Sequence, residues 1–386
     1  MFKEIIIFIY LILFRIVFNI FRLLPLQRGK TVFVASFEDN ILYTLRDVEK
    51  QTDERMIVLR LSDWKVTIQE TARIRVLEFA FPHIFHWFQA VYHLATSKII
   101  FVDNYYGFLA AANVRKEVSV IQLWHAAGAI KLFGLRNPAI SERPAIAKWR
   151  FRKVYQHFDH VVVGCEAMAG IFQESFGIDH EKMLRTGVPR TDFFFDQLAL
   201  EREREKFLRQ YPVIRDKQVI LYAPTFRNGP KTTAELPLNI NEMCQSLCED
   251  YVLFLHLHPA VKVDISISNQ TFVIDLSDYH NVNHLLAFTD ILITDYSSIP
   301  FEFSLLERPM IFFAYDEEAY SVASGFWEPY EDMVPGPIVK NTTELVDALL
   351  QKDAFDMDAV RKFARKWNAY SRGRSSQALV ERFYRS

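Results

Sequence analysis

Histidines and hydroxyl residues stand directly after apolar runs of this sequence, where polar side chains from different strands can act together. His125 and His258 each follow such a run, and the pair Ser297 and Ser298 follows a third. In open α/β sheets, ligands bind beyond the carboxyl ends of the strands. An imidazole can take a proton from a hydroxyl, and hydroxyl and N–H groups can hold phosphate oxygens. The combination indicates displacement at a phosphoryl centre.

His125 ends the run Val118–Trp124 and precedes Gly128. We expect its ring at a strand-to-helix turn, facing a cleft. A neutral imidazole suits a base that acts on a sugar or glycerol hydroxyl. The alternative is a core histidine that caps the strand.

His258 follows the run Tyr251–Leu257, and Pro259 stops the strand behind it. Two roles are open for His258, a hydrogen bond to a phosphate or a proton for a leaving group. His256 is expected to point to the same face but deeper, and no role is assigned to it.

Ser297 and Ser298 precede a segment that has Pro300 in its first turn, as helices often do. Their hydroxyls would lie at the positive end of that helix and bind a diphosphate in place of a glycine-rich loop. The alternative is ordinary helix capping by serine.

Two arginines lie in turns that follow strand-like segments. Arg227, with Thr225 nearby, ends the first strand of the second half, and its planar fork suits a phosphate. The alternative is a surface arginine. Arg190, in the turn Thr186–Asp192, is placed in the cleft.

Short β-rich runs alternate with segments of helical pattern, which predicts doubly wound parallel sheets. The runs are 32–36, 56–61, 98–103, 118–124, 160–165, 219–223, 251–257, 272–276, 291–294 and 310–314. A charged stretch, 198–215, separates the first five from the last five and is expected to be an exposed linker helix.

The predicted fold is therefore α/β, with two Rossmann-like domains that face a cleft. Four regions are expected, namely an amphipathic membrane-associating segment (1–30), an N-terminal Rossmann-like domain (31–197), a C-terminal Rossmann-like domain (198–358) and a basic helix (359–386) that crosses back to the first domain.

The first residues are apolar, with ten in a row from Ile5 to Phe14. Arg15, Asn19 and Arg22 follow at spacings that fall on one helical face, which predicts a helix in the membrane interface. A spanning helix and a secretory signal are the alternatives, but no small-residue cleavage site follows. Either membrane arrangement leaves the body of the protein at the cytoplasmic face.

The composition argues against a disulfide-stabilised protein, a glycine-rich nucleotide-binding loop and a nucleic-acid-binding protein. The chain has 386 residues, a net charge of −2, three cysteines and 12 glycines. The cysteines argue against a disulfide framework, and neither a GxGxxG nor a Walker loop is present. The basic stretches 131–153 and 361–385 suit an anionic membrane surface or a solvated helix face, and no nucleic-acid motif accompanies them.

The joint pattern resembles the CDP-glycerol glycerophosphotransferase family of teichoic acid synthesis. The matching segments are Gln122–Gly128, Thr186–Asp192, Ala223–Arg227, Leu257–Pro259, Ile293–Ser298 and Pro335–Pro337. This resemblance implies a peripheral or monotopic membrane enzyme with the two-domain GT-B architecture of glycosyltransferases. It also implies that the domain 31–197 binds the acceptor and that the domain 198–358 binds CDP-glycerol.

The resemblance also implies roles for single residues. His125 would be the base on the acceptor hydroxyl, and the donor diphosphate would be held by Arg227, His258, Ser297 and Ser298, with Thr225 beside them. His258 is also a candidate for proton transfer. Asp275, Asp295 and Glu302 are weaker candidates for nucleotide or glycerol contacts. No cofactor or metal is required, although Mg²⁺ travelling with the substrate remains compatible.

The form Trp124–Gly128, with Ala126 and Ala127 after the histidine, resembles the primase branch. The branch adds one sn-glycerol 3-phosphate from CDP-glycerol to N-acetylmannosaminyl-N-acetylglucosaminyl-diphospho-undecaprenol and releases CMP. The length agrees, because polymerases usually carry an added amino-terminal region. Other wall teichoic acid enzymes are possible partners. The alternatives are a polymerase or ribitol-phosphate transferase, a nucleotide-sugar glycosyltransferase, and a non-catalytic membrane scaffold.

Overall fold

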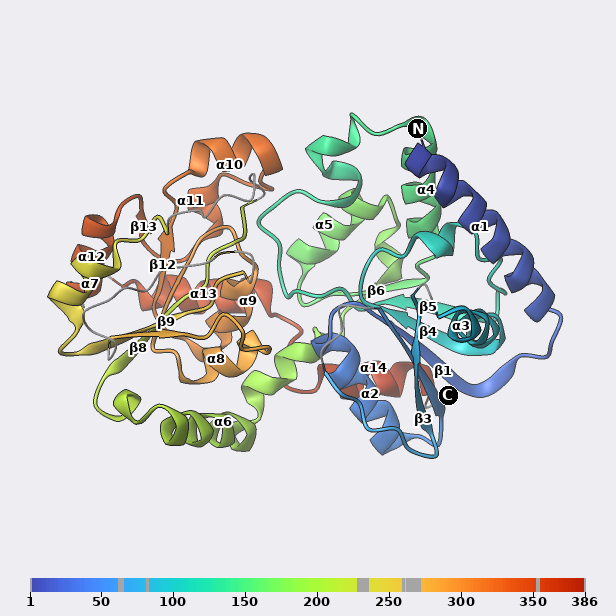
Figure 1. Ribbon diagram of the computed structural model, residues 1–386, viewed down its shortest axis with the longest axis horizontal. Coiled ribbons are helices and arrows are strands. Elements are labelled where there is room, and N and C mark those ends of the chain that lie inside the picture. The colour runs from blue at the N-terminus through green and yellow to red at the C-terminus, as the bar shows by residue number, and fades with distance from the viewer. Residues whose placement is uncertain are drawn as a thin grey trace. The chain divides into compact units, whose positions relative to one another are not determined.

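The computed structural model describes residues 2–61, 66–80, 83–227, 236–258, 261, 272–351 and 355–384 (Figure 1). The chain divides into two compact units. The first comprises Met1–His125, Phe133–Asp192 and Tyr370–Ser386, and the second comprises Ala126–Leu132 and Phe193–Ala369. Pro259, predicted to stop a strand, lies outside the described residues.

The first unit is built on a parallel sheet in the order β3-β2-β1-β4-β5-β6-β7. The strand β1 at its centre pairs with β2 on one side, where Val32 lies opposite Ile57, and with β4 on the other, where Val32 lies opposite Ile100. Apolar residues on both faces of β1 to β5 produce the nearly continuous apolar runs seen in the sequence. The strands are β1 (Gln27–Ala35), β2 (Arg55–Arg60), β3 (Ile74–Glu78), β4 (Ser97–Val102), β5 (Ser119–Gln122), β6 (His160–Val162) and β7 (Met183–Leu184).

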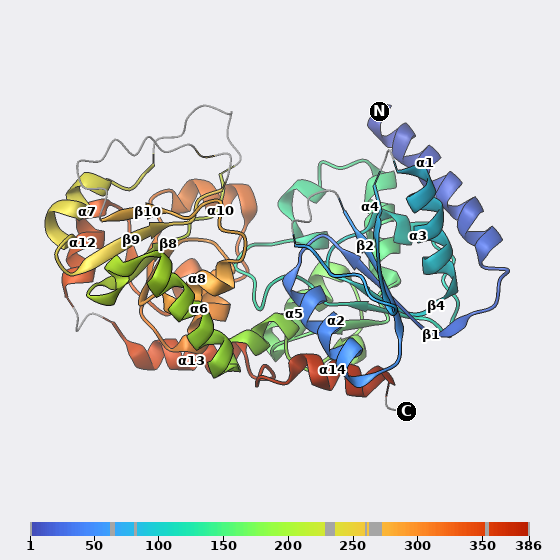
Figure 2. The same ribbon diagram turned by 60° about the horizontal axis from the view of Figure 1, so that its bottom comes forward.

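Helices cover this sheet on both faces, as Figure 2 shows. On one face, α2 (Asp39–Gln51) packs beside α14 (Ser375–Tyr384), and Leu45 and Leu379 enter the same core as Phe33. On the other face lies α3 (Ile84–Thr96), with α4 (Ala145–Gln156) and α5 (Glu166–Phe176) further along the chain.

The first helix, α1 (Phe2–Phe21), lies against α3. Phe14 and Phe18 are buried, and Phe14 packs edge-on against Trp87 with ring centres 6.1 Å apart. By length and composition, Glu4–Phe21 is apolar enough to cross a membrane, with a mean hydropathy of 2.3. The opposite side of the helix is exposed and almost wholly apolar.

The second unit contains a parallel sheet in the order β10-β9-β8-β11-β12-β13. Its strands are β8 (Gln218–Tyr222), β9 (Tyr251–Leu255), β10 (Val273–Asp275), β11 (Ile291–Thr294), β12 (Met310–Phe313) and β13 (Ile338–Val339). Its helices are α6 (Gln197–Gln210), α7 (Ile240–Leu247), α8 (Val282–Phe288), α9 (Ile299–Phe303), α10 (Glu317–Ser324), α11 (Tyr330–Met333), α12 (Thr342–Leu350) and α13 (Met357–Trp367).

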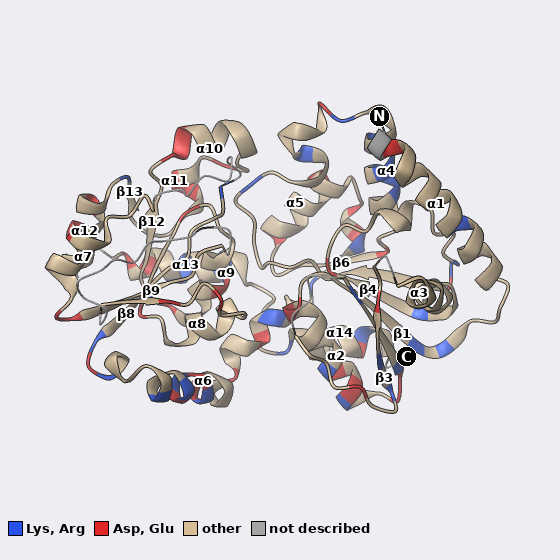
Figure 3. Cartoon of the chain, in the orientation of Figure 1, with Lys and Arg blue, Asp and Glu red and all other residues tan. Residues whose placement is uncertain are grey.

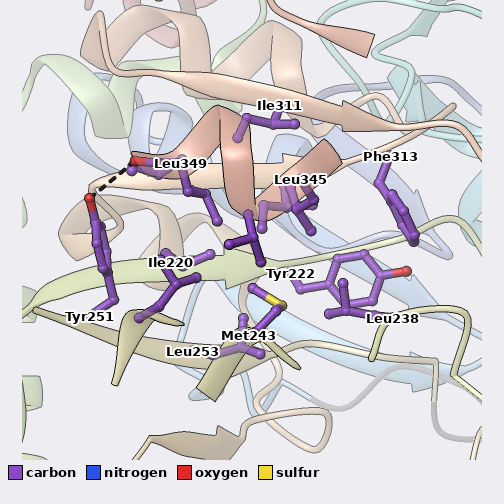
Figure 4. Packing of buried hydrophobic residues seen from close by; sticks show 14 of the residues in the cluster. Ile220, Tyr222, Leu238, Met243, Tyr251, Leu253, Ile311, Phe313, Leu345 and Leu349 are labelled. Carbon is purple, nitrogen blue, oxygen red and sulfur yellow. Dashed lines mark hydrogen bonds between the residues drawn. The ribbon is translucent and has the colours of Figure 1, made fainter. Parts of the chain in front are cut away.

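The core between this sheet and helices α7 and α12 is apolar and closely packed (Figure 4). Met243 of α7 and Leu345 of α12 are fully buried against Ile220 and Ile311 of the strands. Tyr251 places its hydroxyl group 3.4 Å from the Leu349 carbonyl oxygen, so its polar end is also satisfied.

The α/β fold with parallel sheets is confirmed, and several details differ from the prediction. Three short strands, β3, β7 and β13, were not expected. The helix α6 carries alternating charges (Figure 3). It is not a fully exposed linker, because Phe207 is buried and its ring centre lies 3.9 Å from that of Phe288. The tail forms two helices, with α13 in the second unit and α14 in the first. The predicted domain ranges remain a prediction.

Candidate active site

His125 lies in an irregular loop beyond β5, at the carboxyl edge of the first sheet. The strand ends at Gln122, and the next α-helix, α4, begins only at Ala145. The expected strand-to-helix turn is therefore wrong in detail, because short 3₁₀ turns and coil fill the connection. The ring stacks on Phe37, which follows β1, with ring centres 4.1 Å apart, and on Trp124 at 4.2 Å.

The imidazole of His125 is held in one tautomer. Nδ1 lies 3.2 Å from the carbonyl oxygen of Asp103, which follows β4. Because a carbonyl oxygen only accepts, Nδ1 must donate, and Nε2 carries the lone pair. Burial lowers the pKa of His125 to about 4 despite this hydrogen bond. The ring is therefore neutral near pH 7, with a proton-accepting nitrogen.

Asp103 ties the ends of β1 and β4 together. Its carboxyl group accepts from the backbone N–H of Ser36 at 3.0 and 3.1 Å and of Phe37 at 2.7 Å, and from the Tyr106 hydroxyl at 2.5 Å. Burial raises the pKa of Asp103 to about 7 in spite of these donors. Phe37 and the Asp103 carbonyl thereby meet His125 at the point where the strand order reverses, the usual ligand position of such sheets.

Arg190 reaches the same loop. Its guanidinium donates to the His125 carbonyl oxygen at 2.6 Å and pairs with Asp39 at 3.1 Å. The structure thus brings Arg190 to the backbone of His125, as a residue that holds the loop.

Arg227 occupies a cage of acidic and aromatic side chains in the second unit. Its fork donates to Asp316 at 2.7 and 2.9 Å, and to Asp295 at 2.9 Å. The guanidinium carbon lies 4.6 Å from the ring centre of Tyr320 and 5.0 Å from that of Tyr296. Burial alone would lower the pKa of Arg227, but the two carboxylates raise it, so the cation is stabilised.

Asp295 joins this cage to the backbone of Thr225 and to the side chain of Tyr330. It is buried, and its carboxyl group also accepts from the Thr225 N–H at 2.8 Å, while its carbonyl accepts from the Tyr330 hydroxyl at 3.0 Å. Thr225 and Asp295 follow β8 and β11, where the order of the second sheet reverses. The geometry gives Asp295 the task of fixing the loop that carries Thr225 and Arg227.

Ser297 and Ser298 stand before α9, as predicted. The Ser297 hydroxyl oxygen accepts from the Ile299 N–H at 3.3 Å, a local capping bond. Ser298 occupies the cap position without a capping hydrogen bond from its side chain. The capping alternative therefore applies to Ser297, and the Ser298 hydroxyl does not cap the helix.

The segment Ala126–Leu132 belongs to the second unit and packs on α9. The buried Glu302 accepts from the Ala127 N–H at 3.1 Å. A Cβ atom at Gly128 would lie 2.3 Å from the Phe301 ring, so only glycine fits there. Glu302 thus holds a backbone group just beyond the histidine, a contact that the sequence did not suggest.

His258 is exposed and stacks on Phe226 with ring centres 4.0 Å apart. His256 is more buried, as expected, and its Nδ1 donates to the Leu276 carbonyl at 3.1 Å. Asp275 ends β10, where its carboxylate accepts from the Ser277 N–H at 2.9 Å. Within the described residues, no group of three His, Cys, Asp or Glu side chains is placed to hold a metal ion.

A family model described as CDP-glycerol:poly(glycerophosphate) glycerophosphotransferase matches residues 16–385. The chain belongs to this family. Its members are phosphotransferases, so the chain is an enzyme.

Several relatives of the family have known roles in teichoic acid synthesis. The teichoic acid glycerol-phosphate primase of Bacillus subtilis is 35% identical over 363 residues, covering 91% of each chain. A teichoic acid poly(ribitol-phosphate) polymerase of Bacillus spizizenii is 33% identical over 374 residues. That match covers 96% of this chain but 58% of the polymerase, so the chain spans little more than half of that relative.

The fold of this family member is similar to that of solved structures. The wall teichoic acid polymerase TagF matches with a TM-score of 0.81 over 93% of this chain and 89% of the other, at 23% identity. UDP-GlcNAc 2-epimerase from Neisseria meningitidis matches at a TM-score of 0.59 and 15% identity. These likenesses support the α/β fold with two parallel sheets.

Sequence reasoning missed several residues around His125 and Arg227, namely Phe37, Asp103, Tyr106, Asp316 and Tyr320. A signal was present for two of them. Asp103 and Asp316 follow apolar runs, as His125 does, and polar residues beyond strand ends were the starting point of the prediction. The aromatic partners carried no such signal, because stacking depends on the folded chain.

Proposed function

We propose that the protein is a teichoic acid glycerol-phosphate primase. It transfers one sn-glycerol 3-phosphate from CDP-glycerol to the N-acetylmannosaminyl-N-acetylglucosaminyl-diphospho-undecaprenol acceptor, and CMP leaves. The primase of Bacillus subtilis, 35% identical over 91% of both chains, supports this choice. The form Trp124–Gly128 supports the same branch.

The geometry of His125 is the observation that carries the proposed chemistry. Nε2 takes the proton of the acceptor hydroxyl group. At the same time, the oxygen of that hydroxyl group forms a bond to the glycerol-bound phosphorus of CDP-glycerol. The bond from that phosphorus to the bridging oxygen breaks, and the bridging oxygen leaves with CMP. The Asp103 carbonyl, 3.2 Å from Nδ1, keeps Nε2 unprotonated until this step.

The donor diphosphate is proposed to bind at Arg227, His258, Ser297 and Ser298, in the second unit. Hydroxyl and cationic groups of this kind stabilise the charge of a leaving phosphate. Thr225 and Asp295 are proposed at the same site, where they also position the Arg227 loop, because Asp295 accepts from the Thr225 N–H and from the Arg227 fork. We infer a GT-B arrangement, with the acceptor at the first unit and the donor at the second.

A second candidate is transfer of ribitol phosphate or repeated transfer. The 33% identity to a poly(ribitol-phosphate) polymerase favours it. Both alternatives use the same base and the same displacement, so they differ only in the donor polyol and in the number of units added.

Product masses distinguish these functions. The protein is incubated with CDP-glycerol, CDP-ribitol or a UDP-sugar and a synthetic lipid-linked disaccharide, and the products are weighed. One added glycerol phosphate is expected; a ladder or a ribitol product would overturn the primase assignment. His125→Ala should abolish turnover with donor binding retained. His180→Gln, an exposed histidine far along the chain, is the control and should keep full activity.

We further propose that an apolar face of the first unit lies on the cytoplasmic surface of an anionic membrane. It consists of exposed residues of α1 (Ile5, Ile6, Phe8, Ile9, Ile12, Leu13, Ile16 and Ile20), α3 (Ile84, Phe85 and Phe88) and α4 (Ile146 and Trp149). Glu4 of α1 binds Arg150 of α4 at 2.9 Å, so these helices are adjacent. The exposed Arg15, Arg143 and Arg152 supply charge for anionic lipid.

Vesicle flotation tests this face. Ile9→Asp combined with Leu13→Asp should release the protein from vesicles that contain phosphatidylglycerol. Val322→Asp on α10, also an exposed apolar residue, is the control and should leave binding unchanged. Equal flotation of all variants would show that this face does not contact lipid.

A further inference from the structure

The loop that carries His125 has an unusual backbone. Trp124 adopts φ of 60°, a left-handed conformation that bulky residues rarely take. Such a conformation persists only where the surroundings fix it, and it is common at functional sites. The Trp124 ring stacks on Phe133 with centres 4.7 Å apart, but stacking does not determine a backbone angle.

Asn40, in the first turn of α2, holds the carbonyl groups of this loop. Its side-chain amide donates to the Trp124 carbonyl at 2.8 Å and to the Leu123 carbonyl at 3.2 Å. Its amide oxygen accepts from the Arg190 N–H at 2.9 Å. The side chain is 2% exposed, so water does not replace these bonds.

Further polar groups of the loop are bound by neighbouring residues. Gln122 accepts from the Trp124 N–H at 2.8 Å and donates to the Asn104 carbonyl at 3.0 Å. Arg190 donates to the His125 carbonyl at 2.6 Å. Asn40 thus binds the two carbonyl groups that precede His125 in the chain. It also binds the backbone of Arg190, whose side chain holds the His125 carbonyl. Both sides of the His125 backbone are therefore linked to Asn40.

We propose that Asn40 is a positioning residue for His125. It orients the Trp124 carbonyl, and hence the peptide that leads into His125, so that Nδ1 meets the Asp103 carbonyl and Nε2 faces the acceptor hydroxyl. Only an amide supplies two donors and an acceptor in this space. The inference depends on the proposed role of His125 as the base.

Asn40→Asp tests this role, because it keeps the shape and the acceptor but loses both donors. Asn40→Ser is the second variant, since it removes the amide without a buried charge. Asn283→Asp is the matched control: Asn283 is also 2% exposed and also lies in the first turn of a helix, α8. Steady-state kinetics, donor binding by calorimetry and thermal unfolding are measured on the full chain.

Both Asn40 variants should lower kcat about 10²-fold, the usual effect of a displacement near 1 Å, with KM for CDP-glycerol unchanged. The control should keep its kcat. If His125→Ala is inactive while both Asn40 variants remain within about twofold of the wild type, the positioning role is wrong and the base stands. Loss of donor affinity in parallel with kcat would indicate a merely structural role and would also overturn it. Full turnover of His125→Ala would instead refute the proposed function.

Discussion

Gly128→Ala should lower both the stability and the kcat of the protein, and the structure indicates the size of both effects. The added Cβ would lie 2.3, 2.4 and 2.6 Å from three atoms of the Phe301 ring. Carbon atoms in contact are normally about 3.5 Å apart, so a shift of about 1 Å is required. The ring cannot easily give way, because it is buried and packs against Trp367 at 4.6 Å and Phe363 at 5.2 Å.

Overpacking of this kind lowers the free energy of unfolding by about 1–3 kcal/mol. Each kcal/mol lowers Tm by about 2–4 °C. The segment that moves follows His125 by three residues, and a shift of about 1 Å there would lower kcat by about 10²-fold. Scanning calorimetry measures the change in Tm, and the product-mass assay measures the change in kcat.

A double-variant cycle with Phe301→Leu tests the cause. Leucine leaves space for the new methyl group, so the two changes together should cost less than their sum. Additive costs, or a Gly128→Ala variant with wild-type Tm and turnover, would refute the packing argument.

Two further predictions concern charged groups. Arg227→Lys should raise KM for CDP-glycerol about tenfold, because an ammonium group cannot reproduce the fork that meets Asp295 and Asp316; unchanged donor kinetics would show that the fork is dispensable. Asp192→Ala should cost about 1 kcal/mol in thermal unfolding, since its carboxylate accepts from the N–H groups of Ser375 at 2.8 Å and Ser376 at 2.9 Å at the start of α14. An unaltered Tm with wild-type activity would show that this cap is not needed.

The parallel sheets could be predicted because apolar runs buried on both faces leave a strong pattern. The strands β7 and β13 could not, since they have two residues each. The strand β3 has five residues, but only Ile74 and Leu77 are buried, so it leaves no continuous apolar run. The run Val118–Trp124 predicts a strand to its end, yet β5 stops at Gln122. Nothing in a tryptophan indicates a positive φ, and the hydrogen bonds of the Trp124 backbone to Asn40 and Gln122 are formed only in the folded chain.

The site was predictable as a set of strand ends but not as a set of contacts. His125, Arg227 and Asp295 all follow strands, which a linear sequence reveals. Their partners are separated by long stretches: Arg227 and Asp316 are 89 positions apart, and His125 and Asp103 are 22 apart. Pairing at such separations is decided by the strand order, which reverses between β1 and β4 and between β8 and β11.

The low pKa of His125, the proposed base, predicts a specific pH dependence of the reaction. In the free enzyme the imidazole, at a pKa of about 4, stays neutral well below the unfolded value of about 6.5. The unfolded chain therefore binds more protons between these values, and stability falls as pH falls through that window. The acid limb of kcat/KM, which reports the free enzyme, should lie near the low value.

Substrate changes this balance, because the diphosphate brings negative charge that favours the imidazolium form and raises its pKa. The acid limb of kcat, which reports the bound enzyme, should therefore lie at higher pH than that of kcat/KM. Asp103, whose pKa is raised to about 7, titrates nearby, so the profiles are repeated with Asp103→Asn, which keeps the backbone carbonyl. If the acid limb of kcat coincides with that of kcat/KM, or lies at lower pH, the negative charge of the donor does not raise the pKa of His125. A base with a pKa of about 4 would then be too weak for its task, and the proton would have to leave by another group.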